Sequence, residues 1–157
     1  MRAWLGLAAL IAILPPVAGA EEPMTWRFEA GAEDSWRFFT DRVMGGVSEG
    51  RVTVLTEDGT RFARMTGEVS TANNGGFIQM RLDLAEGAAE GAQGVRLIVR
   101  GNSQRYFAHL RTQGTRLPWQ YYQAGFDVGP AWAELRLPFE AFRPSGAMLA
   151  LVPEAGR

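Results

Sequence analysis

The residue types that could support catalysis begin in a glycine-rich loop at residues 41–50, where Ser48 lies in a G-x-S-x-G pattern. Asp83 and His109 follow in the order that hydrolases with a nucleophile elbow use. Such an elbow needs a strand before the serine and a helix after it, whereas the β-branched residues at 51–55 predict a strand. We therefore interpret the pattern as a tight turn whose glycines and hydroxyl satisfy backbone groups.

His109 is the single histidine, and the chain contains no cysteine, so a metal site would depend on carboxylates. No Asp-x-Asp or His-x-His spacing accompanies His109. No expected strand carries two acidic residues two positions apart, the arrangement that would bring together the two carboxylates of a retaining glycoside hydrolase. We therefore expect no metal, no cofactor and no enzymatic activity, and we interpret His109 as a surface or groove residue.

Aromatic and hydrogen-bonding side chains gather in the last third of the chain. Flat apolar faces beside polar groups suit a sugar ring or a protein partner. The alternative is that alternating aromatics fill the core and form cross-strand pairs, which we favour for Tyr122 and Phe126. For Trp119 and Tyr121, on the opposite face, both interpretations remain open. The candidate binding residues are Trp119, Tyr121, Gln123, His109 and Arg111.

A second loop, at residues 70–77, has the same glycine-rich and polar character as the first. Repeated glycines predict positive φ angles or a close approach to another segment, and charged side chains can tie a loop down. The two loops supply candidates for a structural or binding role: Asp41, Arg42, Gly45, Gly46, Ser48, Asn73, Asn74, Gly75 and Gly76. One form of the structural role is a buried polar network of Asp41, Arg42, Asn73 and Asn74 that holds the loops together.

The remaining sequence predicts an all-β fold. Apolar and polar residues alternate at 77–84 and 94–100, which indicates strands with one buried face. Asp58-Gly59 between two β-rich runs predicts a hairpin. Short strands recur every 8 to 12 residues or so, as in a β-sandwich. The expected strands are 24–28, 35–40, 51–55, 61–65, 77–84, 94–100, 105–112, 119–126 and 131–137.

Length and charge limit the possible classes of protein. The 157 residues, 46% hydrophobic, suffice for one core, and we expect a single domain at 24–157. The net charge is −1 and the arginines are spread along the chain, which argues against a nucleic-acid partner.

The first 20 residues have the organisation of a signal peptide. Arg2 precedes an apolar run at 4–14, and Ala18-Gly19-Ala20 matches a cleavage site. The run is shorter than the roughly 20 residues of a spanning helix. We therefore expect export to a bacterial periplasm and no membrane span after cleavage.

Five segments together resemble the NADH:ubiquinone oxidoreductase intermediate-associated protein 30 family: residues 41–48, 67–70, 73–77, 121–126 and 132–142. The resemblance covers about 26–144. It implies a galactose-binding-like jelly-roll β-sandwich, no known catalytic residues and, in mitochondrial members, a chaperone-like role in assembling respiratory complex I. Family members continue with further strands beyond Pro144, so we expect this chain to lack its last strands and to expose a sheet edge.

These observations predict a non-enzymatic exported binding module that acts as an assembly or chaperone-like factor for an envelope protein or complex. The alternative is a carbohydrate-binding module of the cell envelope. The partner is thus expected to be an envelope protein or a glycan.

Overall fold

The computed structural model describes residues 2–13, 24–117 and 119–145. Within them the chain folds into β-strands joined by turns and short 3₁₀ helices, which confirms the predicted all-β class. The strands are β1 (Arg2–Ile13), β2 (Thr25–Trp26), β3 (Trp36–Thr40), β4 (Glu49–Glu57), β5 (Thr60–Glu68), β6 (Ile78–Leu82), β7 (Gly94–Gly101), β8 (Gln104–Leu110), β9 (Tyr121–Val128), β10 (Ala133–Pro138) and β11 (Arg143–Ser145). The 3₁₀ helices are η1 (Ala32–Ser35), η2 (Asp41–Met44), η3 (Ala72–Asn74) and η4 (Phe139–Ala141).

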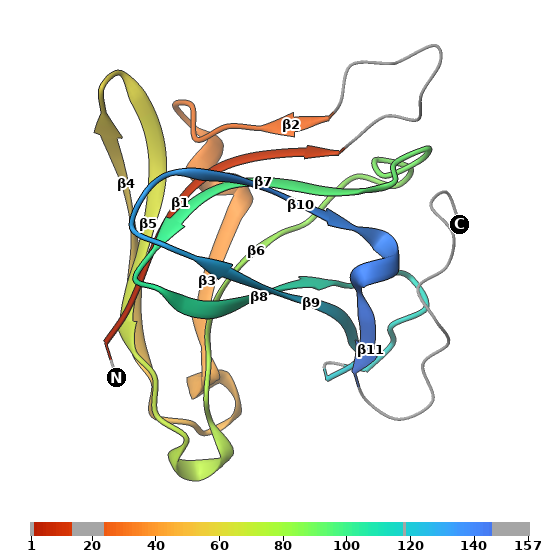
Figure 1. Cartoon of the computed structure of the whole chain (residues 1–157). Helices are drawn as coiled ribbons and strands as arrows, with labels where there is room; N and C mark the ends of the chain where they lie inside the picture. The colour runs from red at the N-terminus through yellow and green to blue at the C-terminus, as the bar shows by residue number, and fades with distance from the viewer. Residues whose placement is uncertain (1, 14–23, 118, 146–157) are drawn as a thin grey trace.

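The strands of the described residues form three antiparallel sheets. The largest has the order β10-β7-β1-β5-β4, with β2 also paired to β1. The second has the order β11-β9-β8, and β3 pairs with β6 in the third. Figure 1 shows β7 and β10 on one side of the molecule and β8 and β9 on the other, an arrangement consistent with a β-sandwich.

The core lies between these layers. Ala63 and Val99, from β5 and β7, are both 0% exposed, and Tyr122 from β9 is 3% exposed. Residues from four strands and two connecting segments meet in one cluster, which closes the largest sheet against the sheet of β8, β9 and β11. The cluster consists of Phe28, Ala63, Met65, Leu97, Val99, Tyr122, Ala124, Val128, Leu137 and Phe142.

The hairpin of β4 and β5 forms as its turn residues predict. Glu57 pairs with Thr60 across a two-residue loop. Asp58 and Gly59 have φ angles of 48° and 76°. Positive φ at both positions defines a type I′ turn, whose twist matches that of the flanking strands.

Most predicted strands are observed with shifted bounds, and β1 and β11 were not predicted. Two of the shifts change the interpretation of a residue. β6 ends at Leu82, so Leu84 lies beyond the strand and is 43% exposed rather than buried. β9 begins at Tyr121, so Trp119 precedes the strand. Before β9, the Gln120 side chain accepts the Leu117 N–H at 2.9 Å, which holds this segment in a turn rather than in the ladder.

The N-terminal segment forms a central strand of the largest sheet. β1 pairs with β5 on one side and with β7 on the other, both antiparallel. It covers most of the segment at 1–20 for which we predict a signal peptide, while residues 14–20 lie outside the described part of the chain. The predicted shortage of C-terminal strands concerns residues 146–157, which also lie outside it. Of the helices in the described residues, none is long and apolar enough to span a bilayer.

Candidate functional site

The loop at residues 41–50 is organised around the buried carboxylate of Asp41. Asp41 directly follows β3 and opens η2, where the Thr40 hydroxyl accepts the Arg42 N–H at 3.2 Å. The residue is 0% exposed. Its Oδ1 accepts the Ser48 N–H at 2.9 Å, and its Oδ2 accepts the Ser48 hydroxyl at 2.5 Å. One carboxylate therefore closes its own loop by two bonds to a single residue.

The same two side chains also hold the loop at residues 70–77. The Gly76 N–H donates to Asp41 Oδ2 at 2.6 Å, and the Phe77 N–H lies 3.4 Å from the same oxygen. Ser48 Oγ accepts the Ser70 N–H at 3.0 Å. We call Asp41, Ser48, Ser70, Gly76 and Phe77 the Asp41 clamp. It joins two loops that are separated in the sequence by β4 and β5.

Two glycines provide the space for this carboxylate. A Cβ at Gly46 would lie 2.3 Å from Asp41 Cγ, and a Cβ at Gly75 would lie 2.4 Å from Asp41 Oδ2. Neither distance is compatible with van der Waals radii. The close approach of backbone to side chain, rather than a positive φ, therefore requires glycine at both positions.

The clamp also fixes the charge of Asp41. Burial alone would raise the pKa of the carboxyl group, because it disfavours the charged form. Donors from the Ser48 side chain and from the N–H groups of Gly76, Ser48 and Phe77 outweigh this effect and lower the pKa below its ordinary value of 3.8. Asp41 is therefore an acceptor-only carboxylate at neutral pH, matched to the donors around it.

Other predicted members of the loops lie outside the clamp. The Arg42 side chain is 66% exposed and faces Glu49, with Nη1 3.5 Å from Oε1. Asn73 and Asn74 are exposed and have φ angles of 56° and 58°, a conformation that asparagine tolerates. The predicted buried network of these three residues with Asp41 is therefore wrong in its membership. Ser48 and backbone N–H groups take their place.

Positive φ angles explain two more glycines of the loops. Gly45, with φ of 93°, ends η2, and its N–H donates to Arg42 O at 3.2 Å. Gly76 has φ of 140° and brings its N–H onto Asp41. The predicted loop set thus contains residues that build the clamp and residues that only shape the chain around it.

Ser48, Asp83 and His109, which follow one another in the order of a hydrolase triad, do not form a triad. Ser48 is 0% exposed and its hydroxyl is bonded to Asp41. Asp83 pairs with Arg37 and, at 2.8 Å, with Arg81. His109 is stacked on Tyr121. The turn interpretation of the G-x-S-x-G pattern agrees with these contacts.

The clamped loop presents apolar side chains to solvent. Val43 is 72% exposed, Met44 63% and Val47 43%. We call these three residues the apolar loop face. Exposed apolar groups are costly to keep in water when they are held together on one ordered segment, and such patches mark interaction sites more often than isolated ones do. The sequence shows that these three residues are apolar, but only their exposure in the structure distinguishes them from core residues.

A second group of predicted residues meets on β8 and β9. His109 lies opposite Gln123 in the strand register. Its ring stacks on Tyr121, with centroids 4.1 Å apart and planes inclined by 19°. Burial lowers the pKa of His109, and a hydrogen bond with Gln123 only partly offsets this. At neutral pH the His109 ring is therefore uncharged, and both stacked residues are half-buried.

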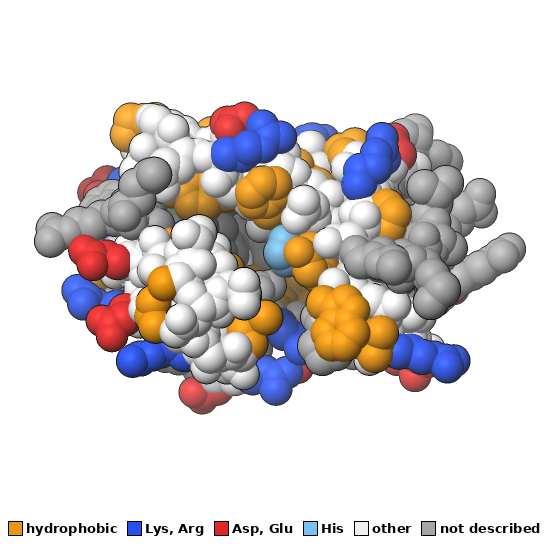
Figure 2. Space-filling view, turned by 90° about the horizontal axis from the view of Figure 1, so that it is seen from below, with side chains coloured by type: hydrophobic (Ala, Val, Ile, Leu, Met, Phe, Trp, Pro, Cys, Tyr) orange, Lys and Arg blue, Asp and Glu red, His pale blue; other side chains and the backbone are white. Residues whose placement is uncertain are grey.

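The flanking candidates are arranged differently. Trp119 is 62% exposed in the loop before β9. Arg111 donates to the carbonyl oxygens of Thr115 and Leu117, at 3.2 and 3.0 Å, and so supports that loop. Figure 2 shows one hollowed face of the molecule, with the pale blue histidine next to hydrophobic side chains. Of the five candidate binding residues, His109, Tyr121 and Gln123 form one contiguous group.

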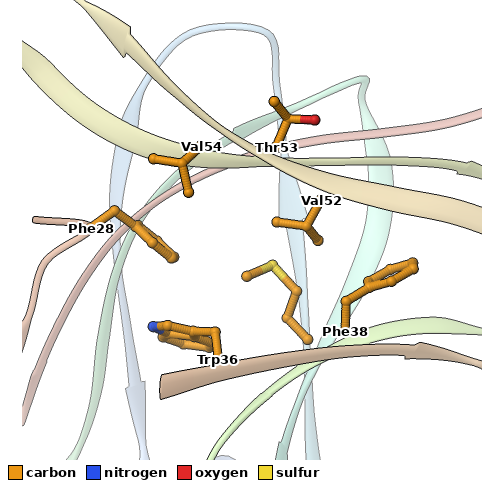
Figure 3. A pocket seen from close by; sticks show the side chains of 7 residues that line it. Phe28, Trp36, Phe38, Val52, Thr53 and Val54 are labelled. Atoms are coloured by element: carbon orange, nitrogen blue, oxygen red, sulfur yellow. The ribbon is translucent and has the colours of Figure 1, made fainter. Parts of the chain in front are cut away.

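An apolar cavity that the sequence did not predict lies between β3 and β4. Its volume is about 480 Å³ (Figure 3). It is lined by Phe28, Trp36, Phe38, Val52, Thr53, Val54 and Met80. Trp36 and Phe38 alternate on β3, while three consecutive residues of β4 line the cavity. Alternation ordinarily indicates a filled core, so no sequence signal could have identified a cavity here.

Metal ligands are not clustered in the described part of the chain. No group of three or more His, Cys, Asp or Glu side chains is placed to hold an ion among residues 2–13, 24–117 and 119–145. In the Asp41 clamp the carboxylate accepts from the Ser48 hydroxyl and from backbone N–H groups, and the Ser48 hydroxyl accepts the Ser70 N–H. The arrangement holds the two loops together.

The described residues form an all-β protein whose antiparallel sheets are consistent with a β-sandwich. A sequence model of the family described as Complex I intermediate-associated protein 30 (CIA30) matches residues 26–152. The chain therefore belongs to the CIA30 family, which confirms the predicted resemblance. No curated protein and no solved structure matches the chain.

Proposed function

We propose that the protein is a non-enzymatic, exported binding module that acts as an assembly or chaperone-like factor for an envelope protein or complex. Membership of the CIA30 family over residues 26–152 is the observation that carries this proposal. The family name refers to intermediates of complex I assembly, which points to a partner that is a protein and not a small substrate.

The apolar loop face supports a protein partner. Val43, Met44 and Val47 protrude from a loop whose backbone is fixed by the Asp41 clamp. A surface that is already ordered loses little conformational entropy on binding. Apolar side chains in the centre of an interface and charges at its rim are the usual arrangement, and the Arg42–Glu49 pair lies beside this face.

Export is the second part of the proposal. The sequence of residues 1–20 supports it, because a basic start, an apolar run and a small-residue cleavage site succeed one another. The absence of cysteine is compatible with an oxidising compartment, since no thiol needs protection there. We therefore propose a partner in the periplasm or in a membrane that faces it.

Affinity purification of the exported protein from envelope extracts tests the proposal. We expect one envelope protein or complex to copurify, and we expect Val43→Ser combined with Met44→Ser to abolish its recovery. The matched control is Leu84→Ser combined with Leu117→Ser, two leucines that are each 43% exposed in other loops. Equal recovery with both double variants would contradict the role of the apolar loop face.

A carbohydrate-binding module is the second candidate, favoured by the stack of His109 on Tyr121. The two stacked rings beside the amide of Gln123 offer the apolar and hydrogen-bonding contacts that a sugar ring requires. Glycan-array binding that is lost in Tyr121→Ala and in Gln123→Ala, and kept in Phe107→Ala, would support this candidate. Phe107 is the control because it is 51% exposed on the neighbouring strand.

A further inference from the structure

The largest sheet contains a strand position that the predicted processing of the chain would empty. β1 lies between β5 and β7 and separates the β4-β5 hairpin from the β7-β10 pair. Residues 2–7 pair with residues 63–68 of β5, from Arg2↔Glu68 to Leu7↔Ala63. Residues 5–8 and 12–13 pair with β7. The same residues carry the sequence features of a cleavable signal peptide.

An empty position there would be costly. β5 and β7 would each expose a row of unpaired backbone N–H and C=O groups. Ala63 and Met65 from β5, and Leu97 and Val99 from β7, belong to the hydrophobic core and flank this position. Loss of β1 would therefore open both the hydrogen-bonded ladder and the core beneath it. A strand of suitable chemistry would regain both sets of interactions.

We infer that the gap between β5 and β7 is a strand-binding site in the exported protein, filled by an extended, uncharged apolar segment of its protein partner. The partner strand would run antiparallel to both neighbours, as β1 does. Main-chain hydrogen bonds supply affinity in this mode of recognition, and alternate side chains supply specificity. The sequence of β1, RAWLGLAALIAI, shows the chemistry that this position accepts: after the first residue, no charge and many small or aliphatic side chains.

This inference rests on the proposed export, because only removal of residues 1–20 empties the position. It explains how a small module could hold an unassembled partner. Such a partner would expose an unpaired apolar strand, and that strand would fill the gap between β5 and β7. The apolar loop face would then be a second, independent contact.

The test uses the protein recovered after export, with its N-terminus defined by intact mass. The probe is a synthetic peptide with the sequence of residues 2–13 and a solubilising tail, added during hydrogen–deuterium exchange. At about 100 times its Kd, we expect the peptide to slow exchange in β5 and β7 about 100-fold. The matched peptide with Leu7→Pro should give no protection, because proline removes a ladder donor in mid-strand.

The test is informative whether the exported chain is folded or unfolded before the peptide is added. If the chain folds only when the peptide is added, protection of β8 and β9 will appear together with that of β5 and β7, which also supports the inference. Exchange that is unchanged by the peptide, or slowed equally by the proline peptide, would overturn it while leaving export intact. An exported, folded protein that still carries residues 2–13 would overturn the inference, because its own β1 would fill the strand position. The intact mass distinguishes this case, in which export stands and cleavage does not.

Discussion

The carboxylate of Asp41 and the hydroxyl of Ser48 lie 2.5 Å apart in the interior of the protein, and both residues are 0% exposed. The two are seven positions apart in one loop, yet together they bind the backbone of a second loop at Ser70 and Gly76. A buried charge is tolerated only when its hydrogen-bonding capacity is filled. The hydrogen bonds of this pair therefore hold the two glycine-rich loops together.

Ser48→Ala should lower the free energy of unfolding by about 1–3 kcal/mol, because it removes the hydroxyl that donates to Asp41 Oδ2 and accepts the Ser70 N–H. Urea unfolding followed by intrinsic fluorescence measures this. The control is Ser70→Ala, since the Ser70 hydroxyl only accepts the exposed Ala72 N–H. We expect a change within about 0.5 kcal/mol for the control. Equal effects of the two substitutions would contradict the role assigned to the Ser48 hydroxyl.

Gly46→Ala and Gly75→Ala should each destabilise the protein by about 1–3 kcal/mol or more, because the new methyl group overlaps the Asp41 carboxylate. The matched control is Gly129→Ala, where a Cβ would meet nothing within 4 Å. Thermal unfolding of the three variants measures the loss of stability that each substitution causes. A Gly46→Ala protein as stable as the control would mean that the carboxylate can move aside at little cost.

The sequence predicted the features that depend on residues close together in the chain. The alternation at 94–100 predicted β7 and its buried Leu97 and Val99, and Asp58-Gly59 predicted the hairpin. These predictions succeed because backbone conformation and side-chain direction follow from neighbouring residues.

Contacts between residues far apart in the chain could not be predicted from neighbouring residues. Whether Asp41 meets Arg42 or Ser48 depends on how two loops approach each other, and composition favoured the wrong partner. The stack of His109 on Tyr121 depends on the register of β8 against β9. For residues 2–13, the basic start and the apolar run predicted a signal peptide, and the pairing of this segment with β5 and β7 depends on strands far along the chain.

Arg100→Lys should lower the free energy of unfolding by about 1 kcal/mol, although the charge and the ion pair with Glu57 can persist. The Arg100 guanidinium lies over the rings of Trp132 and Phe62, 4.6 and 5.2 Å from their centroids, and is largely buried. An ammonium group cannot stack on these rings as a planar guanidinium does. Chemical denaturation measures the effect.

Arg96→Lys is the matched control for that substitution. Arg96 lies on the same strand and pairs with Glu134 at 3.0 Å. Its described contacts include no aromatic ring, so the lysine should retain most of the interaction. A loss at Arg96 as large as that at Arg100 would indicate that the ion pairs, and not the rings, account for the stabilisation.

The lowered pKa of Asp41 makes stability dependent on pH in the acid range. Since the folded-state pKa lies below the unfolded value of 3.8, the folded protein binds fewer protons than the unfolded chain between the two values. The stabilisation is thus fully present above about pH 3.8 and is lost as the pH falls through the folded pKa. Asp41→Asn cannot accept all the donors of the clamp and has no charge to titrate.

Wild type and Asp41→Asn should therefore differ most in stability near about pH 7, and the difference should shrink steadily below about pH 3.8. Urea unfolding at a series of pH values measures both proteins. Asp127→Asn is the control, because Asp127 is an exposed carboxylate paired with Arg105 at 3.3 Å, and its loss should change stability by less than about 0.5 kcal/mol. A difference between wild type and Asp41→Asn that stays constant down to about pH 2 would show that the charge of Asp41 contributes nothing beyond its shape.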